Sequence, residues 1–299
     1  MNIYAAAPKV AYINSYHSDY SWSKECFLSF KNNVPKNTDI YTYHLDSKRN
    51  PSIESINNMA INILDDIEQL NPDIIVAADD NASKYIIEPY FKNASIPVVF
   101  LGVNVDPSKY KYPYKNATGV IESYSSTRFF NLQKLYFKER KPVFIFANTT
   151  TGTRKYNKHK EIYGSKYPVD IVGDTQALFN EISNYSNSDT IFIFDNLWGL
   201  RDFNETFIKN FIEAENNILI ASITDSNKNF SHLIFKQSAR EQGGEAGMMV
   251  SKILSGTLIS DINIKYGVMF GFTVNKPFFT KTNTHLPIGI SAMTNSTNF

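Results

Sequence analysis

Short apolar runs alternate with longer amphipathic segments along almost the whole chain. The first part predicts strands at 10–14, 40–45, 73–78 and 96–104, and helices between them at 23–33, 52–70 and 82–91. Strands that alternate with helices are typical of parallel sheets, because each helix returns the chain to the edge where the next strand starts. The pattern therefore predicts one open sheet of four strands with helices on its faces.

The same alternation starts again after Gly119. Here the pattern predicts helices at 126–137, 155–163, 176–185 and 204–215, and strands at 143–147, 169–172, 190–194 and 218–223. This repeat predicts a second α/β lobe, and a chain of 299 residues suits two domains. Segment 232–256 then predicts a short strand and a helix with Gly256 as its C-cap. Segment 262–275 predicts a final pair of strands, and the tail after it predicts no helix.

Polar and aromatic side chains gather where the predicted strands end. Parallel sheets bind ligands beyond the carboxyl ends of their strands, so these positions are candidates for a binding site. They are Ser15, Tyr16, His17, Trp22, Asp79, Asp80, Asn81, Gly102 and Asn104 in the first part, and Thr149, Thr150, Thr151, Arg154, Asn196, Trp198 and Asp225 in the second. Gln237 ends the strand that returns the chain to the first lobe and is a candidate on the hinge side. Hydroxyls, amides and aromatic rings of this kind suit a small polar or aromatic solute.

Several of these positions also have a structural interpretation. Asp80, Asn81 and Asp225 follow strands directly, where Asp and Asn commonly cap the next helix. His17 is either a ligand contact or a structural imidazole. Arg154 either pairs with a ligand carboxylate or lies in solvent beside neighbouring lysines. The sequence leaves these alternatives open.

The composition excludes several classes of partner. Thirty basic and 29 acidic residues give a net charge of +1, which offers no excess charge to attract nucleic acid or an anionic membrane. No stretch approaches the roughly 18 apolar residues that a membrane span needs. The alanines at 5–7 are compatible either with the remnant of an export signal or with a plain chain terminus. Cys26 is the only cysteine, which excludes an internal disulfide, and its place in a helical pattern favours a buried thiol.

The sequence lacks the usual motifs of catalysis, cofactor binding and metal binding. It contains no nucleophile elbow, phosphate loop or zinc-protease motif, and its five histidines are scattered without metal-ligand spacing. The GGEAG motif at 243–247 lies in a helical pattern and favours close helix packing. We therefore expect no cofactor, no metal and no enzyme activity. The competing hypothesis is an α/β enzyme with Asp79, Asp80, Asp195 or His17 as acid and base.

Several phrases occur in an order that resembles the type I periplasmic-binding-protein-like family of ABC-transporter substrate-binding proteins. They are INSYHSDYSW, PDIIVAADDNA, IPVVFLGVN, ATGVIESYS, NTTTGTR, GGEAGMMVSKILSG and LPIGISAMTNSTNF. The resemblance covers nearly the whole chain. The phrases SYH, FLGVN and TTTGTR look most like the branch that forms extracytoplasmic sensor domains of histidine kinases and diguanylate cyclases. KPFFTKTN after Asn275 departs from the transporter branch.

This resemblance implies two Rossmann-like lobes that are joined by three crossovers and close by a hinge on one small solute. By analogy, the first lobe comprises 9–119 with 229–258, and the second comprises 120–228 with 259–299. The expected function is an extracytoplasmic, ligand-sensing module of a membrane signalling receptor. The alternative is a free or lipid-anchored substrate-binding protein of an ABC transporter. The expected partners are an amino acid, a purine-like compound or a carboxylate, a membrane-embedded signalling protein or permease, and a second copy in a homodimer.

Overall fold

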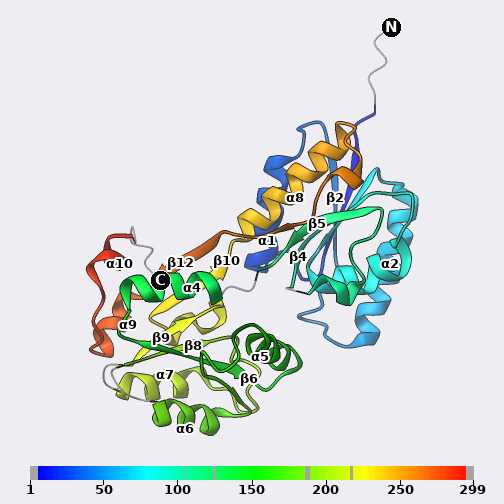
Figure 1. Ribbon diagram of the computed structural model, residues 1–299. Coiled ribbons are helices and arrows are strands. Elements are labelled where there is room, and N and C mark those ends of the chain that lie inside the picture. The colour runs from blue at the N-terminus through cyan, green and yellow to red at the C-terminus, as the bar shows by residue number, and fades with distance from the viewer. Residues whose placement is uncertain (1–5, 105, 124–125, 186–188, 216–217, 294–299) are drawn as a thin grey trace. The chain divides into compact units, whose positions relative to one another are not determined.

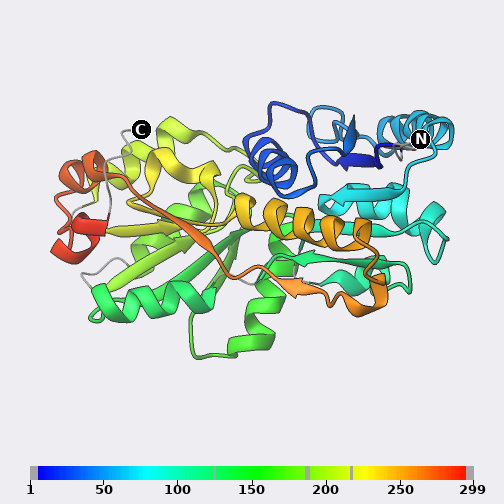
Figure 2. The ribbon, with the colours of Figure 1, turned by 90° about the horizontal axis from the view of Figure 1, so that it is seen from above.

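The computed structural model describes residues 6–104, 106–123, 126–185, 189–215 and 218–293, except the side chains of 126–128, 132, 150, 292 and 293. The chain divides into two compact units (Figure 1). The first unit comprises Met1–Tyr124 with Gln237–Met269, and the second comprises Ser125–Lys236 with Phe270–Phe299. Figure 2 shows the same ribbon from above.

The first unit contains a parallel sheet of six strands in the order β11-β5-β4-β3-β1-β2. Its strands are β1 (Lys9–Asn14), β2 (Asp39–His44), β3 (Ile74–Ala78), β4 (Val98–Val103), β5 (Ala117–Ile121) and β11 (Lys265–Tyr266). The central strands β3 and β4 are buried along their whole length. This explains why they are continuous apolar runs rather than alternating ones.

Helices cover both faces of the first sheet. They are α1 (Ser21–Asn33), α2 (Ile53–Leu70), α3 (Asp79–Ala82), the π-helix η1 (Ser83–Phe91), α8 (Ala239–Leu254) and the short 3₁₀-helices η2 (Pro107–Tyr110) and η4 (Ile259–Asp261). Side chains of α2 and η1 pack on the face that Ile13 and Phe100 line. Side chains of α1 and α8 pack on the opposite face, against Tyr12 and Leu101. The first unit therefore has two hydrophobic cores, one on each side of its sheet.

Helices α1 and α8 pack closely because α8 carries glycine at the contact. A Cβ added at Gly243 would lie 1.9 Å from the Cys26 carbonyl oxygen, and one added at Gly247 would lie 2.6 Å from that of Phe30. The sequence prediction of close helix packing at the GGEAG motif is thus confirmed. Gly256, with φ of +93°, follows the C-cap Ser255, so the predicted end of this helix is correct to within one residue.

The second unit contains a sheet of six strands in the order β12-β10-β9-β8-β6-β7. Its strands are β6 (Lys141–Ala147), β7 (Val169–Val172), β8 (Thr190–Phe194), β9 (Leu219–Ser222), β10 (Leu233–Gln237) and β12 (Phe270–Val274). Its helices are α4 (Ser126–Tyr136), α5 (Thr150–Tyr163), α6 (Thr175–Tyr185), α7 (Glu205–Ala214), the 3₁₀-helix η3 (Asp225–Phe230), α9 (Lys276–Lys281) and α10 (Ile288–Met293). Phenylalanines occur in both of its cores, with Phe192 on one face and Phe144 on the other.

The two α/β units with parallel sheets confirm the predicted fold class, but three details of the prediction are wrong. The first sheet has six strands rather than four, because β5 pairs with β4 and β11 pairs with β5 at one edge. The predicted final strands do not pair with each other, since β11 joins the first sheet and β12 joins the second. The tail contains α9 and α10, where no helix was expected. Asn275 begins α9 by accepting a hydrogen bond from the Phe278 amide at 3.3 Å.

The units also end at other residues than the sequence suggests. The expected lobes are 9–119 with 229–258 and 120–228 with 259–299. In the structure, the chain returns to the first unit at Gln237 and to the second unit at Phe270. Strand β10 extends to Gln237 because Leu233 and Ile234 pair with β9 in the second sheet. Residues 259–269 stay in the first unit because β11 pairs with Val120 and Ile121 of β5.

Candidate ligand-binding site

The carboxyl ends of β1, β3 and β4 bring the first set of predicted residues to one edge of the first sheet. Because these strands are parallel and adjacent, the segments after Asn14, Ala78 and Val103 leave the sheet on the same side. The side chains that follow these strand ends are connected by hydrogen bonds between distant parts of the sequence. We call this group the first edge.

Asp79 is the most buried acid of the first edge, with 5% of its surface exposed. Its backbone has φ of +70°, and its Oδ1 accepts a hydrogen bond from Trp22 Nε1 at 2.9 Å. Burial, together with the charges of Glu122 and Asp80, raises the pKa of the Asp79 carboxyl well above its usual value. A Cβ added at Gly102 would lie 2.8 Å from Asp79 Oδ1, so glycine lets β4 approach this carboxyl.

Asp80 and Asn104 form a second polar contact on the first edge. The Asn104 backbone amide donates to Asp80 Oδ1 at 3.3 Å, and the Asn104 side-chain amide donates to Asp80 Oδ2. Both side chains are half-buried. The capping alternative for Asp80 does not apply, because α3 begins without a side-chain capping bond.

Aromatic rings and a lysine make up another part of the first edge. The Tyr16 and Tyr20 rings lie edge to face at 5.2 Å, and Lys48 Nζ lies 4.6 Å and 4.1 Å from their centres. His17 Nδ1 is 3.3 Å from Asp46 Oδ1. Burial, followed by the charges of Asp79 and Asp80, raises the pKa of Tyr16 well above its usual value. This part of the site therefore combines π-systems with charge of both signs.

Ser15 and Asn81 hold the loops of the first edge in place. The Ser15 hydroxyl, which is fully buried, donates to the Ala78 carbonyl at 2.7 Å and accepts from the Ala82 amide at 2.8 Å. Asn81 Nδ2 donates to Ser47 Oγ at 2.7 Å. These bonds give both residues a structural role, and neither residue caps a helix through its side chain.

Gln237 and Gln242 connect the returning chain to the first edge. Gln237 Nε2 donates to the Ser123 carbonyl at 2.6 Å. The buried Gln242 accepts from the Gly102 amide at 3.0 Å and donates to the Ile121 carbonyl at 3.4 Å. Gln242 was missed by the sequence analysis because it lies in the interior of α8, away from every strand end.

The second unit places its predicted residues at the carboxyl ends of β6, β8 and β9. Thr149 Oγ1 accepts from the Gly152 amide at 3.0 Å and thereby caps α5. Thr151 and Arg154 are exposed in the first turns of this helix. The side chain of Thr150 lies outside the described ones. Of the residues predicted at this strand end, one therefore caps a helix and two have side chains that face solvent.

The remaining predicted residues of the second unit follow the ends of β8 and β9. Asn196 Oδ1 accepts from the Trp198 amide at 2.9 Å, and Trp198 Nε1 donates to the Ser226 carbonyl at 3.0 Å. Trp198 is 59% exposed, so one face of its ring is open to solvent. Asp225 pairs with Lys236 at 2.7 Å and does not cap η3, whose N-cap is Thr224.

A buried acid at the end of β8 was not predicted as a ligand contact. Asp195 is 3% exposed, and its Oδ1 lies 2.9 Å from Lys155 Nζ. The fully buried Asn227 donates to the Asp195 carbonyl at 2.5 Å and to Ser222 Oγ at 3.0 Å. A lysine five residues into a basic helix gives no sequence signal for this pairing.

Removal of the Thr149 hydroxyl is expected to weaken the start of α5. In Thr149→Ala, the Gly152 amide loses its acceptor, which should lower the free energy of unfolding by about 1 kcal/mol. Thr149→Ser keeps a hydroxyl and should lose much less. Urea unfolding followed by Trp198 emission in a Trp22→Phe background measures the effect, and equal losses in the two variants would exclude capping as the cause.

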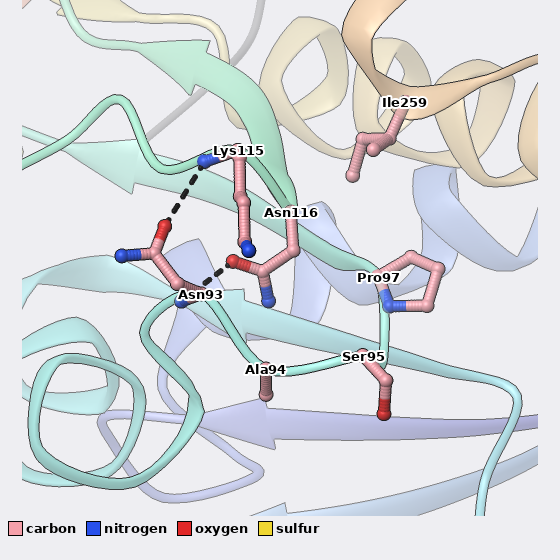
Figure 3. A pocket seen from close by; sticks show the side chains of 7 residues that line it. All are labelled: Asn93, Ala94, Ser95, Pro97, Lys115, Asn116 and Ile259. Carbon is pink, nitrogen blue, oxygen red and sulfur yellow. Dashed lines mark hydrogen bonds between the residues drawn. The ribbon is translucent and has the colours of Figure 1, made fainter.

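A surface hollow of about 440 Å³ in the first unit lies at the opposite edge of the sheet (Figure 3). Pro97 and Asn116, which line it, precede β4 and β5, so they mark the amino ends of these strands. The Asn93 amide donates to Asn116 Oδ1 at 2.9 Å, and the Lys115 amide donates to Asn93 Oδ1 at 3.2 Å. These polar groups hold the loop together, and the hollow is separate from the first edge.

Within the described ranges, two classes of structural feature are absent. No three His, Cys, Asp or Glu side chains lie close enough together to hold a metal ion. None of the helices there has the length and apolar character needed to cross a membrane.

The chain has two α/β units, each with a parallel sheet and with hydrogen-bonding and aromatic groups at its strand ends. This combination is typical of solute-binding proteins of type I periplasmic fold. The chain belongs to the ABC transporter substrate binding protein family, whose model matches residues 36–297. Members of this family bind solutes outside the cytoplasm and are not enzymes, so the acid/base hypothesis is set aside. The predicted family and the predicted lack of catalysis are confirmed. No curated protein is detectably similar in sequence to this chain.

Solved structures show the same fold. CD0873 from Clostridium difficile, a substrate-binding protein with adhesive properties in its open, ligand-free form, has 16% identity and a TM-score of 0.73, with 94% of this chain and 96% of that chain covered. An ABC domain in complex with L-Trp from Streptococcus pneumonia has 12% identity and a TM-score of 0.63, with 96% and 98% covered. An ABC sugar transporter subunit from Rhodobacter sphaeroides has 11% identity and a TM-score of 0.57, with 90% and 98% covered.

Proposed function

We propose that this protein captures a small aromatic or polar solute outside the cytoplasmic membrane and delivers it to the permease of an ABC transporter. The observation that carries this proposal is the match of residues 36–297 to the substrate-binding family. The first edge supports it, since Tyr16 and Trp22 of one segment gather there with Asp79 of another. The proposal adopts the alternative rather than the main expectation from the sequence.

The solute class follows from the chemistry at the two sheet edges. The rings of Tyr16, Trp22 and Trp198 suit a flat solute, and the exposed Arg154 suits a carboxylate. The similar fold from Streptococcus pneumonia was solved with L-Trp. An aromatic amino acid is therefore the first solute to test, with purine-like compounds and simple carboxylates next.

Sensing is the second candidate function. The phrases SYH, FLGVN and TTTGTR favour it, because they resemble the sensor branch of the family. A sensor would be tethered to the membrane, act on a signalling partner and dimerise. Stimulation of the ATPase of a neighbouring ABC permease by the solute-loaded protein would support transport. Flanking membrane spans with a kinase or cyclase domain in the full-length gene would support sensing.

The test of solute binding is a thermal-shift screen with amino acids, nucleobases, sugars and carboxylates. A solute present at about 100 times its dissociation constant adds roughly 2.7 kcal/mol to the stability of the native state. Recovery of the solute chemically intact distinguishes binding from turnover. The absence of any shift across all four classes would count against the proposed function.

Alanine variants then test the two edges. We expect Trp22→Ala and Asp225→Ala each to lower the affinity for the confirmed solute by about tenfold or more, since each removes a side chain from one strand-end group. Phe207→Ala is the control, because Phe207 is 59% exposed on α7 and lies in none of these groups. Titration calorimetry provides the affinities. Unchanged affinity in both variants would refute the assignment of the site.

A further inference from the structure

Three buried polar atoms without partners lie on strand β1 and helix α1, the two elements that neighbour Asp79. Asn14 Oδ1, Tyr12 Oη and Ser23 Oγ accept or donate no hydrogen bond within the described part of the chain, and each of these residues is at most 2% exposed. An unpaired buried polar atom costs roughly 1–3 kcal/mol, so three of them in one place need an explanation.

The strand register places Tyr12 and Asn14 on the strand next to the one that ends before Asp79, and Ser23 follows Trp22 on α1. Asn14 pairs with Ala78, the residue before Asp79, and Tyr12 pairs with Val76 two positions earlier. The Tyr12 and Ala78 side chains belong to the core that α1 covers, and Trp22 of α1 donates to Asp79. The charge of Asp79 also contributes, after burial and Cys26, to the raised pKa of Tyr12. Tyr12 and Asn14 therefore lie on the sheet face that α1 covers, and α1 also contacts the Asp79 carboxyl through Trp22.

The charge around Asp79 is predominantly negative. Glu122 and Asp80 act on its carboxyl, and Lys48 is the cation that opposes them. Lys48 Nζ is itself engaged, since it donates to the Tyr20 hydroxyl at 2.9 Å and lies over the Tyr16 ring. A buried carboxyl with acidic neighbours is stabilised most by an added positive charge.

The charge of Asp79 favours an ammonium group over a water molecule at this place. A water molecule would satisfy the hydrogen bonds but would leave the negative charge of Asp79 uncompensated. An ammonium group brings a positive charge and three N–H donors, which match the acceptors Asn14 Oδ1 and Asp79. The rings of Trp22, Tyr16 and Tyr20 also suit a cation.

We propose that the first edge binds the protonated amino group of the solute, with Asp79 as its counter-ion and Asn14 Oδ1 as a further acceptor. This inference rests on the proposed solute-binding function and deepens it, because it restricts the solute to cationic amines. A simple carboxylate would bring a further negative charge beside the Asp79 carboxyl, and a neutral sugar would leave the charge of that carboxyl uncompensated. Asp79 and Asn14 are thus the residues that determine the specificity of this edge.

The test uses pairs of compounds that share a ring and differ in charge. The first pair is tryptamine and indole propionate, the second is phenethylamine and phenylpropionate, and L-tryptophan carries both groups. Titration calorimetry on the purified chain should show binding of an amine and at least tenfold weaker binding of the acid with the same ring. Asp79→Asn should lower the affinity for the amine by at least tenfold and should not lower the affinity for the acid.

Matched variants separate this effect from a loss of folding. Asn tolerates the positive φ at position 79 and keeps an Oδ1 acceptor for Trp22 Nε1, so Asp79→Asn should fold normally. Asp65→Asn removes the same charge from an exposed position on α2 and should leave the affinity for amines unchanged. Asn14→Leu should lower the affinity for amines and leave the melting temperature unchanged, since it removes an unpaired acceptor.

The outcomes separate the inference from the function on which it rests. Binding of the acids in preference to the amines, or amine affinity that is equal in the parent and Asp79→Asn, would overturn the inference and leave solute binding intact. Equal stabilisation by sodium or potassium chloride alone would also overturn it in favour of a metal ion. Failure of every compound here and in the broader screen would overturn the inference together with the proposed function.

Discussion

Replacement of Gly243 by alanine is expected to destabilise the first unit by about 3 kcal/mol or more. The added Cβ would lie 1.9 Å from the Cys26 carbonyl oxygen and 2.7 Å from its carbonyl carbon. Both atoms belong to the backbone of α1, so the clash is relieved only if one helix moves away from the other. Such a shift would open the core that Tyr12, Phe30 and Met249 fill.

The expected sign is opposite to that of helix propensity. Alanine within a helix is normally more stable than glycine by roughly 0.5–1 kcal/mol. Gly244→Ala is the control on the same helix, because its Cβ meets only side-chain ends, the Ser29 hydroxyl at 3.1 Å and the Asn33 amide at 3.5 Å. Urea unfolding followed by Trp22 emission in a Trp198→Phe background reports on the first unit. Similar midpoints for the two alanine variants would show that α1 and α8 do not constrain each other at Gly243.

The hydrophobic pattern predicted the parallel strands well because burial on both faces makes them continuous apolar runs. Strands β3 and β4 are fully buried and were found within two residues of their ends. Strand β11 gave no such signal, since it consists of two exposed residues. Its partner strand β5 lies over 140 positions earlier in the sequence. Helix α9 has six residues, which is too short to establish a 3.6-residue period.

The tendency of parallel sheets to bind ligands beyond their strand ends selected the residues of the candidate site. It did not predict which hydrogen bonds each of these side chains makes. Asp79, Trp22 and Asn104 came from this tendency directly, since it depends only on strand direction. The structural role of Ser15 depends on the Ala78 carbonyl, 63 positions away, which no local pattern reveals. Gln242 contacts Gly102 from 140 positions away and was missed for the same reason.

Acidification is expected to destabilise the second unit through His232. This histidine is fully buried between Phe278 and Phe279, with ring centres 4.7 Å and 4.8 Å away. Its Nδ1 accepts from the Ile220 amide at 3.0 Å, so the proton of the neutral ring resides on Nε2, 2.7 Å from Thr282 Oγ1. Burial, followed by the positive charge of Arg140, lowers the pKa of His232 to about 3.

The direction of the pH effect follows from the two protonation states. The His232 pKa is about 6.5 in the unfolded chain and about 3 in the folded one, so between these values only the unfolded chain binds the proton. The stability contributed by the neutral ring is fully present above pH 6.5 and decreases as the pH falls toward 3. This one residue should lower the free energy of unfolding by about 1.4 kcal/mol for each pH unit within that window.

The measurement compares urea unfolding of the parent and of His232→Asn from pH 7 to pH 4.5, followed by Trp198 emission in a Trp22→Phe background. Asn retains an acceptor for the Ile220 amide but takes up no proton, so the variant should start less stable and lose stability less steeply with acid. His285→Asn is the control, because His285 is exposed in the same tail and should keep the slope of the parent. Identical slopes for the parent and His232→Asn would mean that His232 takes up its proton in the folded state as readily as in the unfolded one. The buried contact between His232 and α9 would then not be the source of acid sensitivity.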